Sequence, residues 1–196
     1  MEKYLIIGGS IDQQSNIAIH LAQKFAENQK TVIVNFWHGL RVLEEQCDLL
    51  EVVYDIYDFL AETCSLEQLL MESDHTEQLF LAASSFNENK NELSEENILR
   101  LNKMDIPIQI FLSGEKEAEI ALLKHWVNAV IHLDDKNIEE GEFYFQKKKR
   151  AKGIYLGSYP EKQEDEYWNF IQTALTERKD LDMKKSIWQC IKEIFR

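Results

Sequence analysis

The sequence has few of the residues that mark disordered or disulfide-linked chains. Its 196 residues include only two prolines, seven glycines and three cysteines. So few prolines and glycines, with no low-complexity tract, argue against long disordered regions. The cysteines, Cys47, Cys64 and Cys190, form no C-x-x-C pair, which excludes a recognisable zinc or disulfide framework. We expect reduced thiols in a cytosol.

Long apolar runs and an excess of positive charge are also missing. No apolar run approaches the length of a membrane span, and no signal-like apolar region follows Met1, so the chain is expected to be neither secreted nor integral. The net charge of −13 disfavours nucleic-acid binding through the whole surface. The cluster at 147–152 is interpreted as a solvated loop, or as a contact for lipid or an acidic partner.

Hydrophobic residues make up 44% of the chain, and short apolar runs alternate with helical periodicity. This pattern predicts one α/β domain with a doubly wound, mostly parallel sheet flanked by helices. The strands are expected at residues 5–7, 31–36, 79–82, 108–112, 129–133 and 153–156. The helices are expected at residues 15–28, 53–60, 65–71, 94–104, 115–126 and 164–176.

The segment 8–15 lies where a phosphate-binding loop would be, after the first expected strand and before a helix expected near Ser15. A P-loop has the pattern G-x-x-x-x-G-K-[ST], in which backbone N–H groups and the lysine bind phosphate and the hydroxyl binds Mg²⁺. Here Gly8 and Ser15 keep their places, but Gln13 and Gln14 replace the second glycine and the lysine. The pattern predicts a dismantled phosphate site.

Four further segments resemble, in order and spacing, the MinD branch of the ParA/MinD ATPases. They are residues 30–41, 52–55, 65–70 and 76–84. The resemblance covers residues 6–133, about two-thirds of the chain, and is weaker beyond. It implies a P-loop NTPase-like fold of the MinD/ParA type that is shortened in its C-terminal part.

The resemblance also implies which residues stand at the working positions of that family. Gly9 and Gln14 stand at the two lysines. Asn35 stands at the aspartate that ends the second strand, Trp37 at the aspartate two residues later, and Leu112 at the Walker B aspartate. An indole cannot orient water as a carboxylate does. Phosphoryl transfer depends on positioning and charge neutralisation, so losing these groups together predicts no catalytic residues and no hydrolysis.

The degenerate nucleotide loop can be interpreted in two ways. It is either a polar β-α turn that caps a helix, or a site of weak, noncatalytic ATP or ADP binding through backbone N–H groups and Ser15. The residues concerned are Gly8, Gly9, Ser10, Gln13, Gln14 and Ser15. We expect no cofactor, and no metal because the five histidines lack ligand spacing.

The segment 183–196 has the pattern of an interfacial helix. Its apolar face is Ile187, Trp188, Ile191, Ile194 and Phe195, and its basic residues include Lys184, Lys185 and Lys192. Such a helix lies among lipid headgroups, with about 1 kcal/mol per basic residue, and MinD-like proteins end similarly. We therefore expect a domain at 1–176, a linker at 177–182 and a membrane helix at 183–196. The alternative is a terminal helix that packs on the sheet or on a partner.

These features predict a catalytically inactive, MinD-like pseudo-ATPase of the bacterial cytoplasm, peripheral at the inner face of the cell membrane. It would scaffold or position an unidentified protein, alone, as a homodimer or with a related ATPase, and without nucleic acid. One alternative is a dimeric regulator that binds nucleotide without hydrolysis, in division, partitioning or pilus or flagellar placement. Another is an altered loop that binds a different small ligand for unrelated chemistry.

Overall fold

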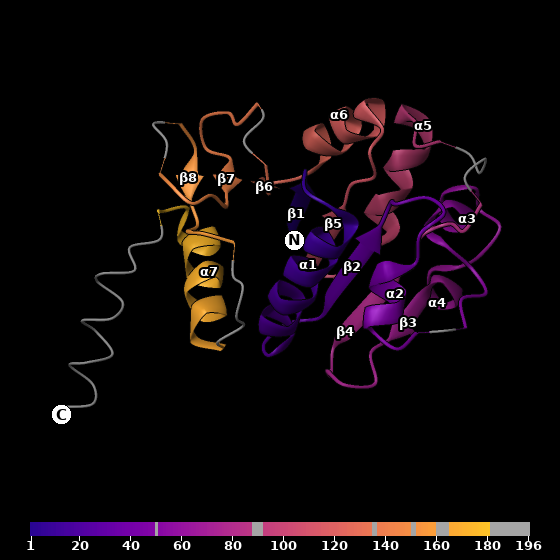
Figure 1. Cartoon of the computed structure of the whole chain (residues 1–196). Coiled ribbons are helices and arrows are strands. Elements are labelled where there is room, and N and C mark those ends of the chain that lie inside the picture. The colour runs from indigo at the N-terminus through magenta and orange to yellow at the C-terminus, as the bar shows by residue number, and fades with distance from the viewer. Residues whose placement is uncertain (50, 88–91, 135–136, 150–151, 160–164, 181–196) are drawn as a thin grey trace.

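In the computed structural model, the described residues are 1–49, 51–87, 92–134, 137–149, 152–159 and 165–180. They contain an eight-stranded sheet in the order β3-β4-β2-β5-β1-β6-β7-β8, with helices on both faces (Figure 1). The expected doubly wound α/β fold is therefore confirmed.

Strands β1, β5 and β2 form the centre of the sheet. All neighbouring strands pair in parallel except β3 and β4, which are antiparallel. In the central register Ile6 of β1 lies between Leu112 of β5 and Ile131 of β6. The strands are β1 (Glu2–Ile7), β2 (Thr31–Asn35), β3 (Leu70–Glu72), β4 (Leu79–Ala82), β5 (Ile108–Leu112), β6 (Ala129–His132), β7 (Phe143–Tyr144) and β8 (Ile154–Tyr155).

The helices divide between the two faces of the sheet because successive strand residues point in opposite directions. Helices α1, α2 and α7 share one apolar cluster with the strands, and α3, η1 and α6 share the other. The helices are α1 (Ile11–Ala26), α2 (Val42–Gln46), α3 (Ile56–Leu60), α4 (Leu66–Leu69), α5 (Glu95–Ile98), the 3₁₀ helix η1 (Leu99–Lys103), α6 (Glu117–Trp126) and α7 (Asp165–Glu177).

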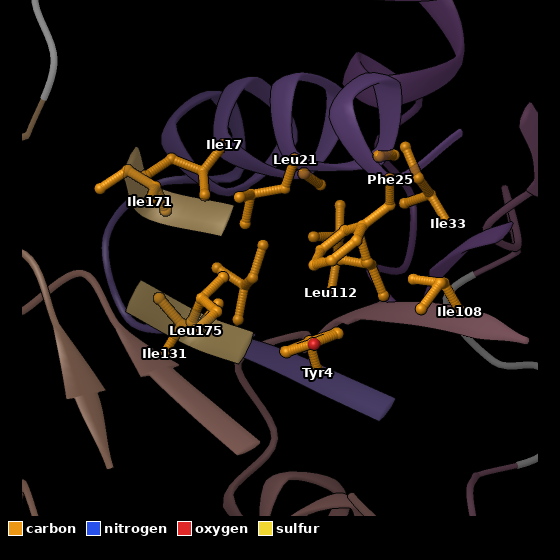
Figure 2. Close-up of a cluster of buried hydrophobic side chains, with 14 of the residues drawn as sticks. Tyr4, Ile17, Leu21, Phe25, Ile33, Ile108, Leu112, Ile131, Ile171 and Leu175 are labelled. Carbon is orange, nitrogen blue, oxygen red and sulfur yellow. The ribbon is translucent and has the colours of Figure 1, made fainter. Parts of the chain in front are cut away.

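The larger core lies between α1, α7 and the sheet. Figure 2 shows Ile17 and Leu21 of α1 and Ile171 of α7 pointing toward Leu112 and Ile131 on the strands. All five side chains are fully buried. Burying a branched aliphatic side chain contributes about 1.5–3 kcal/mol, so this layer fixes the position of α1 and of the junction that precedes it.

Several expected elements differ from the observed ones. Helix α1 begins at Ile11, four residues earlier than expected, because Ser10 caps it. The helix expected at 65–71 ends at Leu69, since the next residues pair with β4 as the edge strand β3. The helix expected at 94–104 is divided into α5 and η1, and the short elements α2 and β7 were not predicted.

The C-terminal predictions stay predictions. Helix α7 ends at Glu177, one residue beyond the expected domain boundary. The proposed membrane helix at 183–196 lies outside the described residues, as does the end of the linker at 177–182. Within the part of the chain that is described, no helix is long and apolar enough to cross a membrane.

Candidate functional site

The junction between β1 and α1 is a short turn and not an open loop. Gly8 and Gly9 both have positive φ, at 74° and 67°, and Ser10 is the N-cap of α1. The Ser10 hydroxyl accepts from the Gln13 N–H, and the Gln13 side chain accepts from the Ser10 N–H. Such a capping box satisfies two helix N–H groups internally. Half of the predicted phosphate loop is therefore the first turn of α1, which begins at Ile11.

Gln14, which stands at the family's lysine position, holds this turn together. Its Nε2 donates to the Gly8 carbonyl at 3.1 Å, and its Oε1 accepts from Trp37 Nε1 at 3.1 Å. Gln14 is 1% exposed and Trp37 is 7% exposed. Because the amide is buried and bonded at both ends, its hydrogen-bonding capacity is used to join α1 to the segment after β2.

The position of the first family aspartate, at the end of β2, belongs to another buried network. Asn35 Nδ2 donates to Glu44 Oε1 at 3.2 Å, and Asn35 Oδ1 accepts from the Trp37 N–H. Glu44 is 1% exposed and also accepts from the Ser84 N–H at 2.7 Å. These groups connect the carboxyl ends of β2 and β4 through α2, so their bonding capacity is used within the fold.

Side chains lie close to one side of each of the two glycines. A Cβ atom built on Gly8 would lie 2.6 Å from the carboxylate carbon of Asp134, and one on Gly9 would lie 2.6 Å from Oε1 of Gln13. Asp134 thus packs its carboxylate against the turn at which a P-loop would bind phosphate. An anion there would meet like charge.

A cleft of about 660 Å³ opens beside this turn, at the carboxyl ends of β1, β5 and β6. Open parallel sheets bind ligands at this edge, outside the carboxyl ends of the strands, at the topological switch point where the strand order reverses. Figure 1 shows α6 above the end of β1 on this side. The turn at 8–9, Gln14 and Trp37 line one side of the cleft, and Lys124 and His132 line another. Its acidic lining residues are Glu115, Glu117, Asp134 and Glu139.

Three titratable side chains, Lys124, Glu142 and His132, are linked by hydrogen bonds on the α6 side of the cleft. Glu142 accepts from Lys124 Nζ at 2.8 Å, pairs with His132 Nε2 at 2.7 Å and accepts from the Glu139 N–H. Burial lowers the pKa of His132, against the opposing effect of Glu142. Burial alone would raise the pKa of Glu142, but its bonds to Lys124, Glu139 and His132 lower it. His132 is therefore neutral and Glu142 ionised near pH 7.

Two other residues that stand at functional positions of the resembled family lie within the protein interior. Leu112, at the Walker B position, is fully buried in β5. Ser15 is also fully buried, and its Oγ has no hydrogen-bond partner among the described residues. Across the described ranges, no group of three or more His, Cys, Asp or Glu residues could hold a metal ion.

Comparison with solved structures identifies the fold. A plasmid partition protein from Borrelia burgdorferi bound to AMPPNP aligns with a TM-score of 0.68 and 13% identity, covering 90% of this chain and 98% of that one. Another Borrelia burgdorferi partition protein structure aligns at 0.67 with 15% identity, covering 91% and 100%. This chain has the ParA/MinD-type P-loop ATPase fold. At such identities the likeness establishes the fold alone.

MinD structures are also similar to this chain, over a smaller part. MinD in the MinC:MinD complex of Aquifex aeolicus aligns with a TM-score of 0.51 and 19% identity, covering 68% of this chain and 56% of that one. No protein-family model matches the chain, and none of the curated proteins does. The resemblance recognised in the sequence is confirmed at the level of fold.

The structure brings together some of the predicted residues and adds others. Gly8, Gly9, Ser10, Gln13, Gln14 and Ser15 all lie at the β1–α1 junction. The second predicted surface, Lys184 to Phe195, lies outside the described residues. Sequence reasoning missed His132 and Asp134, although residues that follow a buried parallel strand are expected at the ligand-binding edge. Glu142 has no sequence signal, because only folding brings it to His132.

Proposed function

We propose that this chain is a noncatalytic protein of the ParA/MinD fold that acts by binding another protein, and that its β1–α1 junction holds no nucleotide. The single observation that carries the proposal is the closure of this junction by the chain's own groups. Gln14 bonds to Gly8 and Trp37, and Gln13 bonds to Ser10. A phosphate would have to displace these bonds without gaining a lysine in return.

The charge around the junction also opposes a nucleotide. The positive end of a helix favours anions, but the Asp134 carboxylate already lies beside Gly8, in the turn that precedes α1. Lys124 is the one cation that lines the cleft among the described residues, and its ammonium is paired with Glu142 at 2.8 Å. The residues present therefore do not fit a nucleoside triphosphate.

A bound Mg²⁺ ion fits no better. In the resemblance Ser15 is the one group retained from the metal site, and it is fully buried in α1. Leu112 offers no oxygen where a carboxylate would be needed. Phosphoryl transfer without a lysine, a metal-shell carboxylate or a water-orienting carboxylate lacks its recurring parts.

Calorimetric titration of the full chain with ATP and Mg²⁺ tests this proposal. We expect no saturable heat and no phosphate release above that of the buffer. The matched control is Ser15→Ala, which removes the one retained hydroxyl with little change in volume. Hydrolysis by the unmodified chain that Ser15→Ala abolishes would overturn the proposal.

A second candidate is a dimeric regulator that binds nucleotide without hydrolysing it. The observation that favours it is the Ser15 hydroxyl, whose Oγ lacks a partner among the described residues. A buried polar atom without a hydrogen bond is unusual in native structures. Saturable ATP heat without turnover, together with a change from monomer to dimer in sedimentation, would support this candidate over the first.

We also propose that the segment 183–196 attaches the protein to the inner face of the cell membrane. The support is its sequence, in which the spacing of Trp188 and Ile191 is that of one apolar helical face with lysines around it. A short helix of this kind binds weakly alone, so a dimer or a membrane partner would strengthen attachment.

A fluorescent protein fused to residues 183–196 tests the membrane proposal, as single and tandem copies. We expect the tandem fusion to mark the membrane, and Trp188→Glu with Ile191→Glu to make it diffuse. Diffuse signal from both unmodified fusions would contradict it.

A further inference from the structure

The cleft at the carboxyl ends of β1, β5 and β6 has a charge opposite to that expected of a phosphate site. Among the described residues its lining includes four carboxylates and one ammonium. The carboxylates come from three segments: the turn after β5 with the start of α6, the end of β6, and the segment before β7. The ammonium of Lys124 is already paired with Glu142. The field in the cleft therefore favours a cation.

His132 supplies a second and independent feature of this cleft. The side chain lines the cleft yet is only 1% exposed, and its Nδ1 has no hydrogen-bond partner among the described residues. An unpaired buried acceptor costs free energy that a ligand can recover. The acidic residues and this imidazole nitrogen thus point to the same kind of ligand.

The hydrogen bond between His132 Nε2 and Glu142 determines whether the other ring nitrogen, Nδ1, is a hydrogen-bond donor or acceptor. Its Nε2 lies 2.7 Å from Glu142 Oε2, and an ionised carboxylate only accepts hydrogen bonds. The Nε2 atom therefore carries the proton, and in a neutral imidazole Nδ1 is then an acceptor. Burial lowers the pKa of His132, which agrees with the neutral form. A partner for Nδ1 must bring an N–H or O–H donor.

We propose that this cleft binds a cationic amine, an ammonium or guanidinium group that donates to Nδ1 of His132 while Glu115, Glu117, Asp134 and Glu139 balance its charge. The other walls suit the carbon chain of such a ligand, since Ile7, Trp37 and Ile120 also line the cleft. A volume of about 660 Å³ accommodates a polyamine or an extended basic side chain. A free polyamine and the basic side chain of another protein share one chemistry, a flexible alkyl chain that ends in a positively charged nitrogen.

The inference does not depend on whether the junction excludes nucleotide. The turn at 8–9, Gln14 and Trp37 line the same cleft, but the groups proposed to pair with the positive nitrogen lie on its α6 and β6 side. An ATP titration with saturable heat would overturn the proposed function and leave amine binding to be judged by its own measurements. Failure of amine binding would leave the closure of the β1–α1 junction unaffected.

The test uses the full chain and two probes, spermidine and an end-blocked tetralysine peptide. Nitrogen NMR of the imidazole rings follows His132 in the unmodified protein, so the result does not depend on a variant that folds. We expect the Nδ1 resonance of His132 to move saturably with at least one probe. Spermidine alone would identify a free amine, and the peptide alone would identify a basic side chain from a protein. An unchanged resonance with both probes would overturn the inference.

A pair of matched variants separates this site from general attraction to an acidic protein. Glu115→Gln with Glu117→Gln removes two carboxylates of the cleft, and Glu67→Gln with Glu77→Gln removes two exposed carboxylates outside it. Calorimetry should give a roughly 2- to 30-fold weaker affinity for the first pair and less than about a twofold change for the second. Equal weakening by both pairs would overturn the inference.

Discussion

The two sides of the candidate site differ in how fully their polar groups are satisfied. On the side of α1 and β2, Gln14 and Asn35 each bond to two partners within the fold. On the side of α6 and β6, the His132 Nδ1 lacks a partner among the described residues, and carboxylates surround an open cleft. One edge of a sheet can thus be closed to one ligand chemistry while the neighbouring region stays available to another.

The largest loss of stability is expected from removing the Trp37 indole, which closes the α1 and β2 side of the site. Trp37→Ala creates a cavity and leaves the Gln14 amide oxygen unpaired, so we expect a loss of about 3–5 kcal/mol in the free energy of unfolding. Urea denaturation measures it. Trp37→Phe is the control, because it keeps most of the volume and should lose less. A loss below about 0.5 kcal/mol for Trp37→Ala, the range of neutral surface substitutions, would contradict the closed side.

The next largest loss of stability is expected from replacing Glu44, the buried carboxylate on the α1 and β2 side. Glu44→Ala leaves Asn35 Nδ2 and the Ser84 N–H without their acceptor, and each unpaired buried donor costs about 1–3 kcal/mol. Glu44→Gln keeps one amide oxygen and should cost less. The measurement is again urea denaturation at neutral pH, and equal stabilities of the two variants would refute this account of the network.

The α6 and β6 side, which contains His132, should make the stability of the fold depend on pH. The pKa of His132 is lowered in the folded chain, so below its ordinary value of 6.5 the unfolded chain binds more protons. Stability should therefore fall as the pH falls below about 6.5, by at most about 1.4 kcal/mol per pH unit for one proton. The lowered pKa of Glu142 adds a loss in the same direction below its ordinary value of 4.5.

Melting curves at several pH values measure this slope. His132→Gln should reduce the slope above pH 5, whatever its effect on stability at neutral pH. The exposed His125→Gln serves as the control of the same residue type. A His132→Gln slope equal to that of the unmodified chain would show that the buried imidazole does not titrate as described.

The smallest stability effect is expected for the carboxylates that line the cleft. Glu115 and Glu117 are exposed, so their replacement by glutamine should change the free energy of unfolding by less than about 0.5 kcal/mol. A larger loss, measured by urea denaturation, would mean that these carboxylates support the fold rather than a ligand.

The sequence predicted the sheet well because its central strands are buried on both faces. The strands at 79–82 and 108–112 were placed without error, since short, mostly apolar runs of that length are typical of strands in a parallel sheet. The edge strand β3 was mistaken for the end of a helix, because Leu70 and Met71 have no strand-specific pattern and pair only when β4 is present.

The candidate site was only partly predictable for a related reason. The loss of the lysine and aspartates is visible in the sequence, but the bonds that replace them are not. Gln14 and Trp37 are 23 residues apart, and their hydrogen bond depends on the packing of α1 against the sheet. The early start of α1 depends on the capping box of Ser10, which has glutamine rather than the more familiar glutamate at its fourth position.

The central claim is that the chain's own hydrogen bonds close the β1–α1 junction, and the indole N–H of Trp37 reports on it directly. Proton–nitrogen NMR can follow this group while ATP and Mg²⁺ are added to the full chain. We expect an indole resonance that is protected from exchange with water and does not move during the titration. A saturable shift of that resonance, abolished by Ser15→Ala, would contradict it.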